Sequence, residues 1–280
     1  MTPERTLART PFVRWPSFSA LPFVALNLVG LLAYLHPFFF AETSRRDARW
    51  FEHSTDAPLI FGAIGALCMA LVVVDLTNGR LTSKSLAALA VLAAFAAVLR
   101  TVTLPAGANL YWLLVILGGY AFGPRMGFLL GALSMFLSAV VTGGIGPWLP
   151  FQMFASAWIG LAAGCAGLLA PRLGLRGSWY ETVFLAAFGA VAAVSYGLIV
   201  NLWSWPFWVA GPDISYEPGI GAAEALRRYW NFYLLTSFGW DLVGSVCNVI
   251  VLVTVGRPLL RALLRFQARF SWSGFDARER

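Results

Sequence analysis

The polar side chains that could do chemistry in this 280-residue chain are few, and they lie within long apolar stretches. Gln152 follows residues 143–150, a Gly- and Pro-rich segment too rigid for a passive connector. Its amide, beside Trp148, suits the orientation of a large ligand of mixed polarity. Polar groups inside a membrane are costly and therefore suggest function. We expect a ligand site formed by Asn109, Tyr111, Trp112, Trp148, Gln152, Asn201, Trp203 and Asn231.

Catalytic chemistry has weaker support. Asp241 and Glu181 could serve as acid and base, near the middle or inner ends of their helices, so a membrane-embedded enzyme acting on a lipid or an isoprenoid stays the alternative. Against it, the sequence has no GxxxxGK[ST], HExxH or GxSxG motif and no paired-aspartate cluster. The three cysteines form no CxxC pair, and the two histidines stand apart. We expect no catalytic residue, no metal and no cofactor, and we interpret the chain as a substrate-binding subunit that depends on another protein for energy.

The composition indicates the class of protein. Hydrophobic residues make up 59% of the chain and charged residues 12%, whereas soluble domains carry roughly 25% charged residues. Residues 126–171 contain no charge, which is more than the roughly 20 apolar residues that span a bilayer. The sequence therefore predicts an all-α, multi-pass protein of the cytoplasmic membrane. A soluble enzyme and a nucleic-acid-binding module are excluded, although the net charge is +7.

Apolar runs between Gly, Pro and charged breakers predict the helices that must position these side chains. Eight spans are expected, over residues 17–40, 57–76, 86–99, 109–122, 126–142, 150–170, 179–208 and 229–256. With the amino terminus in the cytoplasm, 14 of the 20 basic residues lie inside and 6 outside, as the positive-inside rule requires. Both termini are therefore expected in the cytoplasm, and Gln152, Asn201 and Asn231 in the outer half.

Three parts follow from this map. Residues 1–78 form a two-helix extension, residues 79–257 a six-helix membrane domain, and residues 258–280 a cytoplasmic tail. Basic residues recur every fourth position at the start of this tail, which predicts an amphipathic helix that binds anionic lipids or a cytoplasmic partner. These residues are Arg257, Arg261, Arg265 and Arg269.

Small residues recur at helical spacing in two places. On the helix predicted over 86–99, alanines four apart give a smooth face, Ala90 with Ala94 and Ala93 with Ala97. Such a face lets another helix approach closely, either within the same bundle or from another membrane subunit. Glycines also recur every four residues from 119 to 131, across Pro124, and predict a tight hairpin with close helix contacts.

Three phrases between residues 100 and 164 resemble the substrate-binding membrane subunit, or S component, of energy-coupling factor (ECF) vitamin transporters. They are LVILGGYAFGPR at 114–125, GFLLGA at 127–132 and GGIGPWLPFQM at 143–153. The resemblance implies a six-helix bundle with both termini inside. It also implies a vitamin or related micronutrient bound near the outer face, partly under the loop from Thr101 to Asn109.

The resemblance further implies partners. The alanine face, here Ala90, Ala93, Ala94 and Ala97, would contact the coupling transmembrane subunit, with two ABC ATPases below it. The phrase at 146–153 looks most like the branch proposed to import cobalamin or a related corrinoid, while riboflavin and queuosine precursors also suit the expected site. The extension 1–78 departs from the family pattern, and a non-transporting assembly factor that works through this extension is a third hypothesis.

Overall fold

The computed structural model describes residues 17–40, 53–78, 81–104, 107–208 and 211–275. Every named element in these ranges is a helix, and an isolated bridge joins Thr103 and Asn109. The helices are α1 (Ser17–Phe40), α2 (His53–Thr77), α3 (Ser83–Thr101), α4 (Tyr111–Phe122), α5 (Pro124–Thr142), α6 (Leu149–Leu169), α7 (Trp179–Ser204), η3 (Trp205–Phe207), α8 (Ala222–Thr236), α9 (Phe238–Val251), η4 (Leu252–Gly256) and α10 (Arg257–Phe275).

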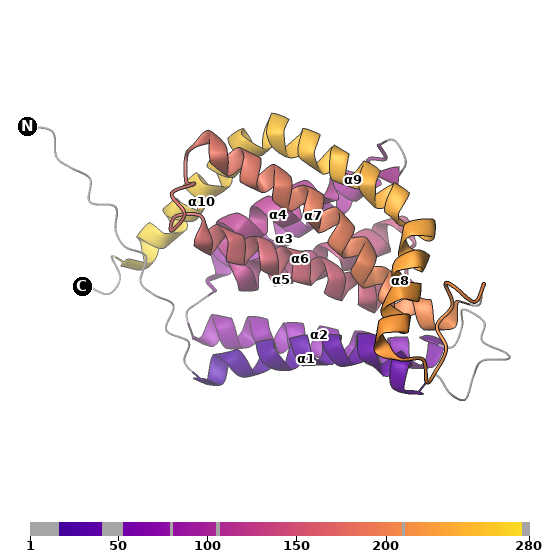
Figure 1. The fold of residues 1–280 in the computed structure, drawn as a ribbon. Helices are drawn as coiled ribbons and strands as arrows, with labels where there is room; N and C mark the ends of the chain where they lie inside the picture. The colour runs from indigo at the N-terminus through magenta and orange to yellow at the C-terminus, as the bar shows by residue number, and fades with distance from the viewer. Residues whose placement is uncertain (1–16, 41–52, 79–80, 105–106, 209–210, 276–280) are drawn as a thin grey trace, which may run out of the picture.

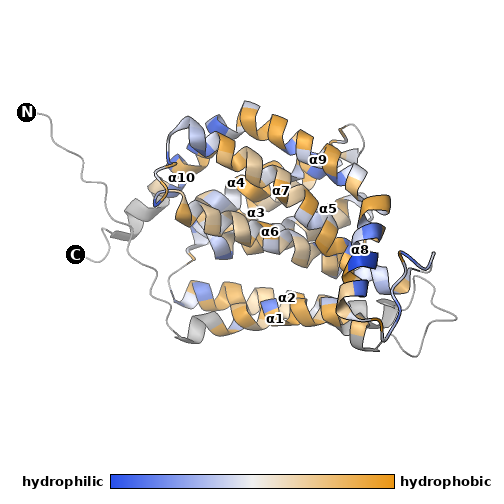
Figure 2. Ribbon diagram, in the orientation of Figure 1, coloured by the Kyte–Doolittle hydropathy of each residue, from blue (hydrophilic) through white to orange (hydrophobic). Residues whose placement is uncertain are grey.

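The long helices run side by side in one bundle (Figure 1). Among the described residues, six helical stretches are long and apolar enough to cross a membrane, and two shorter apolar helices lie at Leu21–Leu35 and Tyr111–Phe122. Most of the bundle is hydrophobic in Figure 2, whereas α8 carries the most hydrophilic turns. The described residues thus form an all-helical membrane protein, in agreement with the predicted class.

The last predicted span, over 229–256, is wrong in its first part. The helix breaks at Ser237, whose φ of −128° is not helical, so that α8 and α9 are separate helices. Figure 1 shows α8 lying across one end of the bundle, which we name the α8 end, while α9, η4 and α10 continue as one rod toward the opposite end. Glu224, Arg227 and Arg228 in α8 explain this placement, because charged side chains favour a position at the bundle end over one within it.

Glycines form the tightest helix contacts, as the sequence predicts. A Cβ atom on Gly127 of α5 would lie 2.7 Å from the carbonyl carbon of Gly160 in α6 and 2.8 Å from Cα of Gly119 in α4. One Cβ on Gly131 would lie 2.8 Å from Cα of Ala157. These backbones approach so closely that only hydrogen fits between them. We name Gly119, Gly127, Gly131 and Gly160 the glycine seam.

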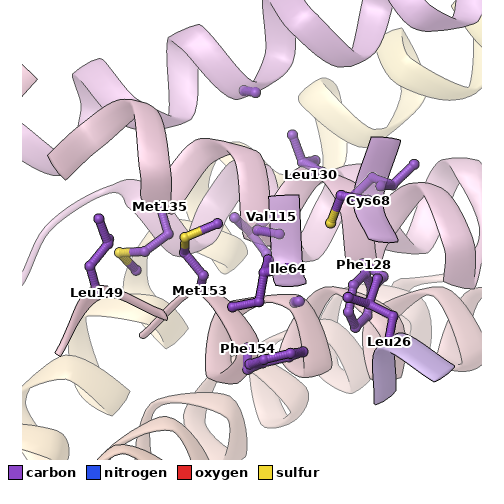
Figure 3. Packing of buried hydrophobic residues seen from close by; sticks show 14 of the residues in the cluster. Leu26, Ile64, Cys68, Val115, Phe128, Leu130, Met135, Leu149, Met153 and Phe154 are labelled. Atoms are coloured by element: carbon purple, nitrogen blue, oxygen red, sulfur yellow. The ribbon is translucent and has the colours of Figure 1, made fainter. Parts of the chain in front are cut away.

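Helices α1 and α2 pack as a pair along one side of the bundle (Figure 1). The hydroxyl of Tyr34 donates to the carbonyl oxygen of Phe151 at 2.7 Å, and the indole N–H of Trp158 donates to Asn27 Oδ1 at 2.9 Å. Figure 3 shows Leu26 and Ile64 of this pair in the same cluster as residues of the bundle, among them Phe128 and Phe154. The extension is therefore packed into the hydrophobic core.

A buried ion pair also links this extension to the bundle. The guanidinium of Arg125 donates to Asp75 Oδ1, and the side chain of Asp75 is only 3% exposed. Removing one partner of a buried pair leaves the other charge uncompensated, at a cost of about 3–5 kcal/mol. We expect Asp75→Asn to lower the free energy of unfolding in detergent by about 3 kcal/mol. Thr77→Val, an exposed change two residues away, is the control, and equal thermal stability of the two variants would contradict the prediction.

The predicted amphipathic tail is a helix, α10, but its apolar side packs on the protein. Leu260 and Leu263 are buried in a cluster that includes Leu117 and Tyr120 of α4, while Arg261 and Arg265 are exposed. The side chains of Arg269 and of the residues after it lie outside the described part of the chain. The basic face is thus available to a lipid surface or a partner.

Candidate functional site

At the α8 end, polar groups from α4 and α5 meet inside the bundle. Tyr111, in the first turn of α4, is buried, and its hydroxyl lies 3.1 Å from the carbonyl oxygen of Gly131 and 3.0 Å from Ser134 Oγ. The ring of Trp112 stands edge-on to Tyr111 and to Tyr196 of α7, with centroids 5.0 and 4.8 Å apart. Tyr111 and Trp112 of the predicted site therefore share one interior position, and the third member, Tyr196, was not predicted.

Asn109 belongs to the loop above this position. Its Oδ1 accepts a hydrogen bond from the backbone N–H of Tyr111 at 3.1 Å, and its backbone pairs with Thr103. These contacts tie both ends of the loop to the start of α4. Asn109 thus fixes its end of the loop to the start of α4, a positioning role that its amide side chain performs within the protein.

Arg100, at the last turn of α3, is a second residue that the sequence analysis did not predict. Its Nη1 donates to Ser138 Oγ at 3.1 Å, and Ser138 is fully buried in α5. The charge count treats Arg100 as one of six outer loop charges, whereas the side chain is half-buried and directed into the bundle. In the sequence, only its place as a lone Arg at the end of an apolar helix could have indicated this inward-directed side chain.

Trp148 and Gln152 lie at the start of α6. The indole N–H of Trp148 donates to the carbonyl oxygen of Gly144 at 3.1 Å, and its ring covers Gly146, so that the 143–148 segment is folded onto this side chain. Trp148 itself is 41% exposed. Gln152 is half-buried, and within the described part of the chain its amide forms no hydrogen bond. Its amide is therefore available to a ligand.

The other predicted residues have partners within the protein. Trp203 stacks on Phe151 with an interplanar angle of 10° and a centroid distance of 4.9 Å, and it belongs to the core. The amide of Asn201 donates to Ser237 Oγ at 2.6 Å, and that of Asn231 to the carbonyl oxygen of Asp213 at 3.4 Å. Asn201 and Asn231 thus brace the junction of α7, α8 and the preceding loop.

Charged residues hold that loop on α8. Arg228 Nε donates to Glu224 Oε1 at 2.7 Å, and Arg228 Nη1 donates to the carbonyl oxygen of Ser215 at 3.2 Å. Hydrogen bonds from Arg227 and Arg228 lower the pKa of Glu224 to about 2. The carboxylate therefore stays ionised at neutral pH and holds the two guanidinium groups on α8, from which Arg228 reaches the carbonyl oxygen of Ser215.

The two carboxylates of the enzyme alternative lie far apart. Asp241 accepts a hydrogen bond from Tyr233 at 2.9 Å and packs against Gly197 near the α8 end of α7. Glu181 accepts bonds from Tyr120 at 2.8 Å and from the backbone N–H of Gly177 at 2.9 Å, at the opposite end of α7. Sixteen residues of helix separate Gly197 from Glu181, about 24 Å at 1.5 Å per residue. Asp241, in the first turn of α9, and Glu181, in the first turn of α7, thus lie at opposite ends of the bundle, and the two groups cannot act on one substrate atom. The described residues also contain no group of three or more side chains suited to a metal ion.

The four alanines of α3 do not share one exposed face. Ala93 and Ala97 are 0% and 1% exposed and pack inside the bundle, whereas Ala90 and Ala94 are exposed. Ala93 and Ala97 thus pack within the bundle, and contact with a coupling subunit stays a prediction for the exposed pair, Ala90 and Ala94. Because nearly every residue of α3 is apolar or small, the sequence does not determine which side of the helix faces inward.

Two comparisons of the chain with known proteins, one with curated proteins and one with solved structures, gave no match. A third, with models of protein families, matches residues 84–256 to the family described as "ECF transporter, substrate-specific component". The match begins in α3 and ends in η4, and it covers more than half of the chain. The chain belongs to the substrate-specific component family of ECF transporters.

Proposed function

We propose that this chain binds a vitamin or related micronutrient at the α8 end and delivers it by ATP-driven reorientation in an ECF-type importer. The observation that carries the proposal is the meeting of Tyr111, Trp112 and Tyr196 beneath a pinned loop at that end. Ligand pockets in proteins combine aromatic walls with a few convergent polar groups. Substrate-specific components act with an ECF membrane subunit and ATPases, so the chain needs no nucleotide site of its own.

The α8 end faces outward in this proposal. Helix α1 begins and α10 ends at the opposite end of the bundle (Figure 1), which supports eight crossings with both termini in the cytoplasm. More basic residues of the described helices and loops lie at that opposite end than at the α8 end, which supports the same orientation.

For the ligand, we propose cobalamin or another corrinoid as the first candidate, with riboflavin and queuosine precursors next. The Gly-Pro-Trp segment before Gln152, folded around Trp148, supports a large planar ligand at the mouth of the site. Docking to the coupling subunit is proposed through Ala90 and Ala94, the exposed pair of the α3 alanines.

The proposal is tested by purifying the chain in detergent and identifying the copurifying small molecule by absorbance and mass spectrometry. Coexpression with an ECF membrane subunit and its two ATPases should then give ATP-dependent uptake of that molecule. No copurifying ligand, no binding to a panel of corrinoids, riboflavin and queuine, and no uptake would together reject it.

One variant tests the position of the site. Trp112→Leu removes the ring that stands between Tyr111 and Tyr196, and we expect ligand affinity to fall about 10-fold, since aromatic contacts contribute about 1.5 kcal/mol. Trp179→Leu is the control, because Trp179 is exposed at the opposite end of α7. Equal affinities in fluorescence titrations of the two variants would place the site elsewhere.

A further inference from the structure

The side chain of Arg100 is directed away from lipid. Its guanidinium donates to Ser138 Oγ, and Ser138 is fully buried on the side of α5 that packs within the bundle. It also lies within electrostatic range of the phenols of Tyr111 and Tyr196, on α4 and α7. A guanidinium that reaches lipid phosphates would instead extend outward from the end of its helix. Arg100 thus brings a positive charge to the interior position beside the first turn of α4.

This charge has no carboxylate partner in the described part of the chain. The ion pairs found there join Arg125, Arg227 and Arg228 to acidic residues, and none brings an acidic oxygen within 4.0 Å of Arg100. The end of α3 offers only the partial negative charge of a helix carboxyl terminus, roughly half a charge. A half-buried guanidinium is stable when it is paired and hydrogen-bonded, so the position lacks an anion.

Hydroxyl groups from neighbouring helices surround the same position. Tyr111, Ser138 and Tyr196 supply hydroxyls from α4, α5 and α7, and Ser156 supplies one from α6. The hydroxyl of Ser156 is buried next to the phenols of Tyr111 and Tyr196 and forms no hydrogen bond of normal geometry with either of them. Buried polar atoms are nearly always satisfied, so this hydroxyl can turn toward a bound acceptor as well as toward a phenol. Hydroxyls can donate to an anion without adding charge of their own.

We infer that the ligand of this protein carries an anionic oxygen group, a carboxylate or a phosphate, which Arg100 binds and which the hydroxyl of Ser156 contacts. The inference rests on the proposed function, and it narrows the substrate class to micronutrients with an acidic group. The planar fork of a guanidinium holds two oxygens of such a group at once, which fixes orientation as well as charge. The neutral aromatic wall of Trp112 and Tyr196 then faces the rest of the ligand.

Matched pairs of probes test the inference on the full-length chain in detergent. The pairs are nicotinate with nicotinamide, biotin with biotinamide, pantothenate with pantothenol, and riboflavin 5′-phosphate with riboflavin. Cyanocobalamin is compared with cobinamide, which lacks the phosphate together with the attached ribose and base. For the pair that binds, we expect the anionic member to bind at least about 10-fold more tightly than the neutral member. Hydrogen bonds to charged groups contribute enough binding free energy for a difference of this size. The pair that shows this preference identifies the anionic group as a carboxylate or as a phosphate.

Variants assign the preference to Arg100. Arg100→Gln should reduce the affinity for the anionic member about 30-fold and leave that for the neutral member within about 2-fold. Arg100→Lys should retain part of the preference, because lysine keeps the positive charge but cannot bind two oxygens at once as the planar guanidinium does. Arg257→Gln, at the opposite end of the bundle, is the matched control. Retained binding of the neutral probe shows that a variant is folded.

The results separate the inference from the proposed function. If a probe binds and its neutral counterpart binds equally well, or if Arg100→Gln leaves the preference unchanged, the inference is overturned while the proposed function stands. If no probe, riboflavin or queuine binds to the chain, the proposed function fails and the inference fails with it. A preference lost in Arg100→Gln and kept in Arg257→Gln supports both.

Discussion

Gly127→Ala is expected to lower the thermal unfolding midpoint in detergent by about 10 °C, although alanine is the better helix former. Helix propensity alone would stabilise this variant by up to about 1 kcal/mol. In the glycine seam the substitution is expected to destabilise the protein instead, because the added methyl would lie 2.7 Å from the carbonyl carbon of Gly160. A backbone atom cannot change rotamer to relieve the overlap, so α5 and α6 must separate. Such overpacking costs about 3 kcal/mol or more.

Two glycines of α2 provide the controls for this experiment. Gly62 and Gly65 are exposed, and a Cβ atom on either would meet no atom within 4 Å. Gly62→Ala and Gly65→Ala should therefore leave the midpoint unchanged or raise it slightly, as judged by tryptophan fluorescence and size-exclusion chromatography. A midpoint for Gly127→Ala equal to that of the controls would mean that α5 and α6 do not approach as closely as the structure shows.

Ala94→Trp is expected to abolish copurification of the chain with an ECF coupling subunit while the ligand affinity stays within about 2-fold. Ala94 and Ala90 are exposed and small, so they allow a partner helix to approach closely, and an indole there would keep the two helices apart. The expected loss of assembly is at least about 10-fold, since close helix packing is the main attraction within a bilayer. Copurification through a tag on the coupling subunit measures it.

Two further variants make the result specific. Ala93→Trp places the same bulk at a position that is 0% exposed, so it should prevent folding, with loss of ligand binding as well as assembly. Val191→Trp adds bulk to an exposed position of α7 and should affect neither property. If Ala94→Trp assembles normally and Val191→Trp does not, the coupling subunit contacts α7, and the proposed docking face is wrong.

Much of the fold follows from local composition. The apolar runs predict the long helices to within a few residues, and the glycine repeat predicts the close approach of α4, α5 and α6. The single large error is α8, where Tyr229 and Trp230 extend an apolar run that the break at Ser237 divides. Aromatic residues occur both within membrane spans and at the membrane–water interface, so hydropathy does not distinguish these two locations.

Only some of the predicted site residues come together in the structure, and the reason differs from that for α8. Tyr111 is buried and Trp112 packs beside it, whereas Trp203, Asn201 and Asn231 have partners within the protein. A sequence shows that a residue is polar or aromatic and near one end of a span. Whether its hydrogen bonds are already made depends on helices distant in the chain.

The sequence by itself determined that this protein is an all-helical membrane protein of the ECF substrate-specific component family, because length, hydropathy and local phrases are properties of consecutive residues. Only the tertiary structure decided which side of each helix faces inward. In a water-soluble protein an amphipathic pattern marks that side, but α3 is apolar all round, so packing alone buries Ala93 and exposes Ala94. The same packing turns Arg100 from one outer charge among six into the positive group inside the candidate site.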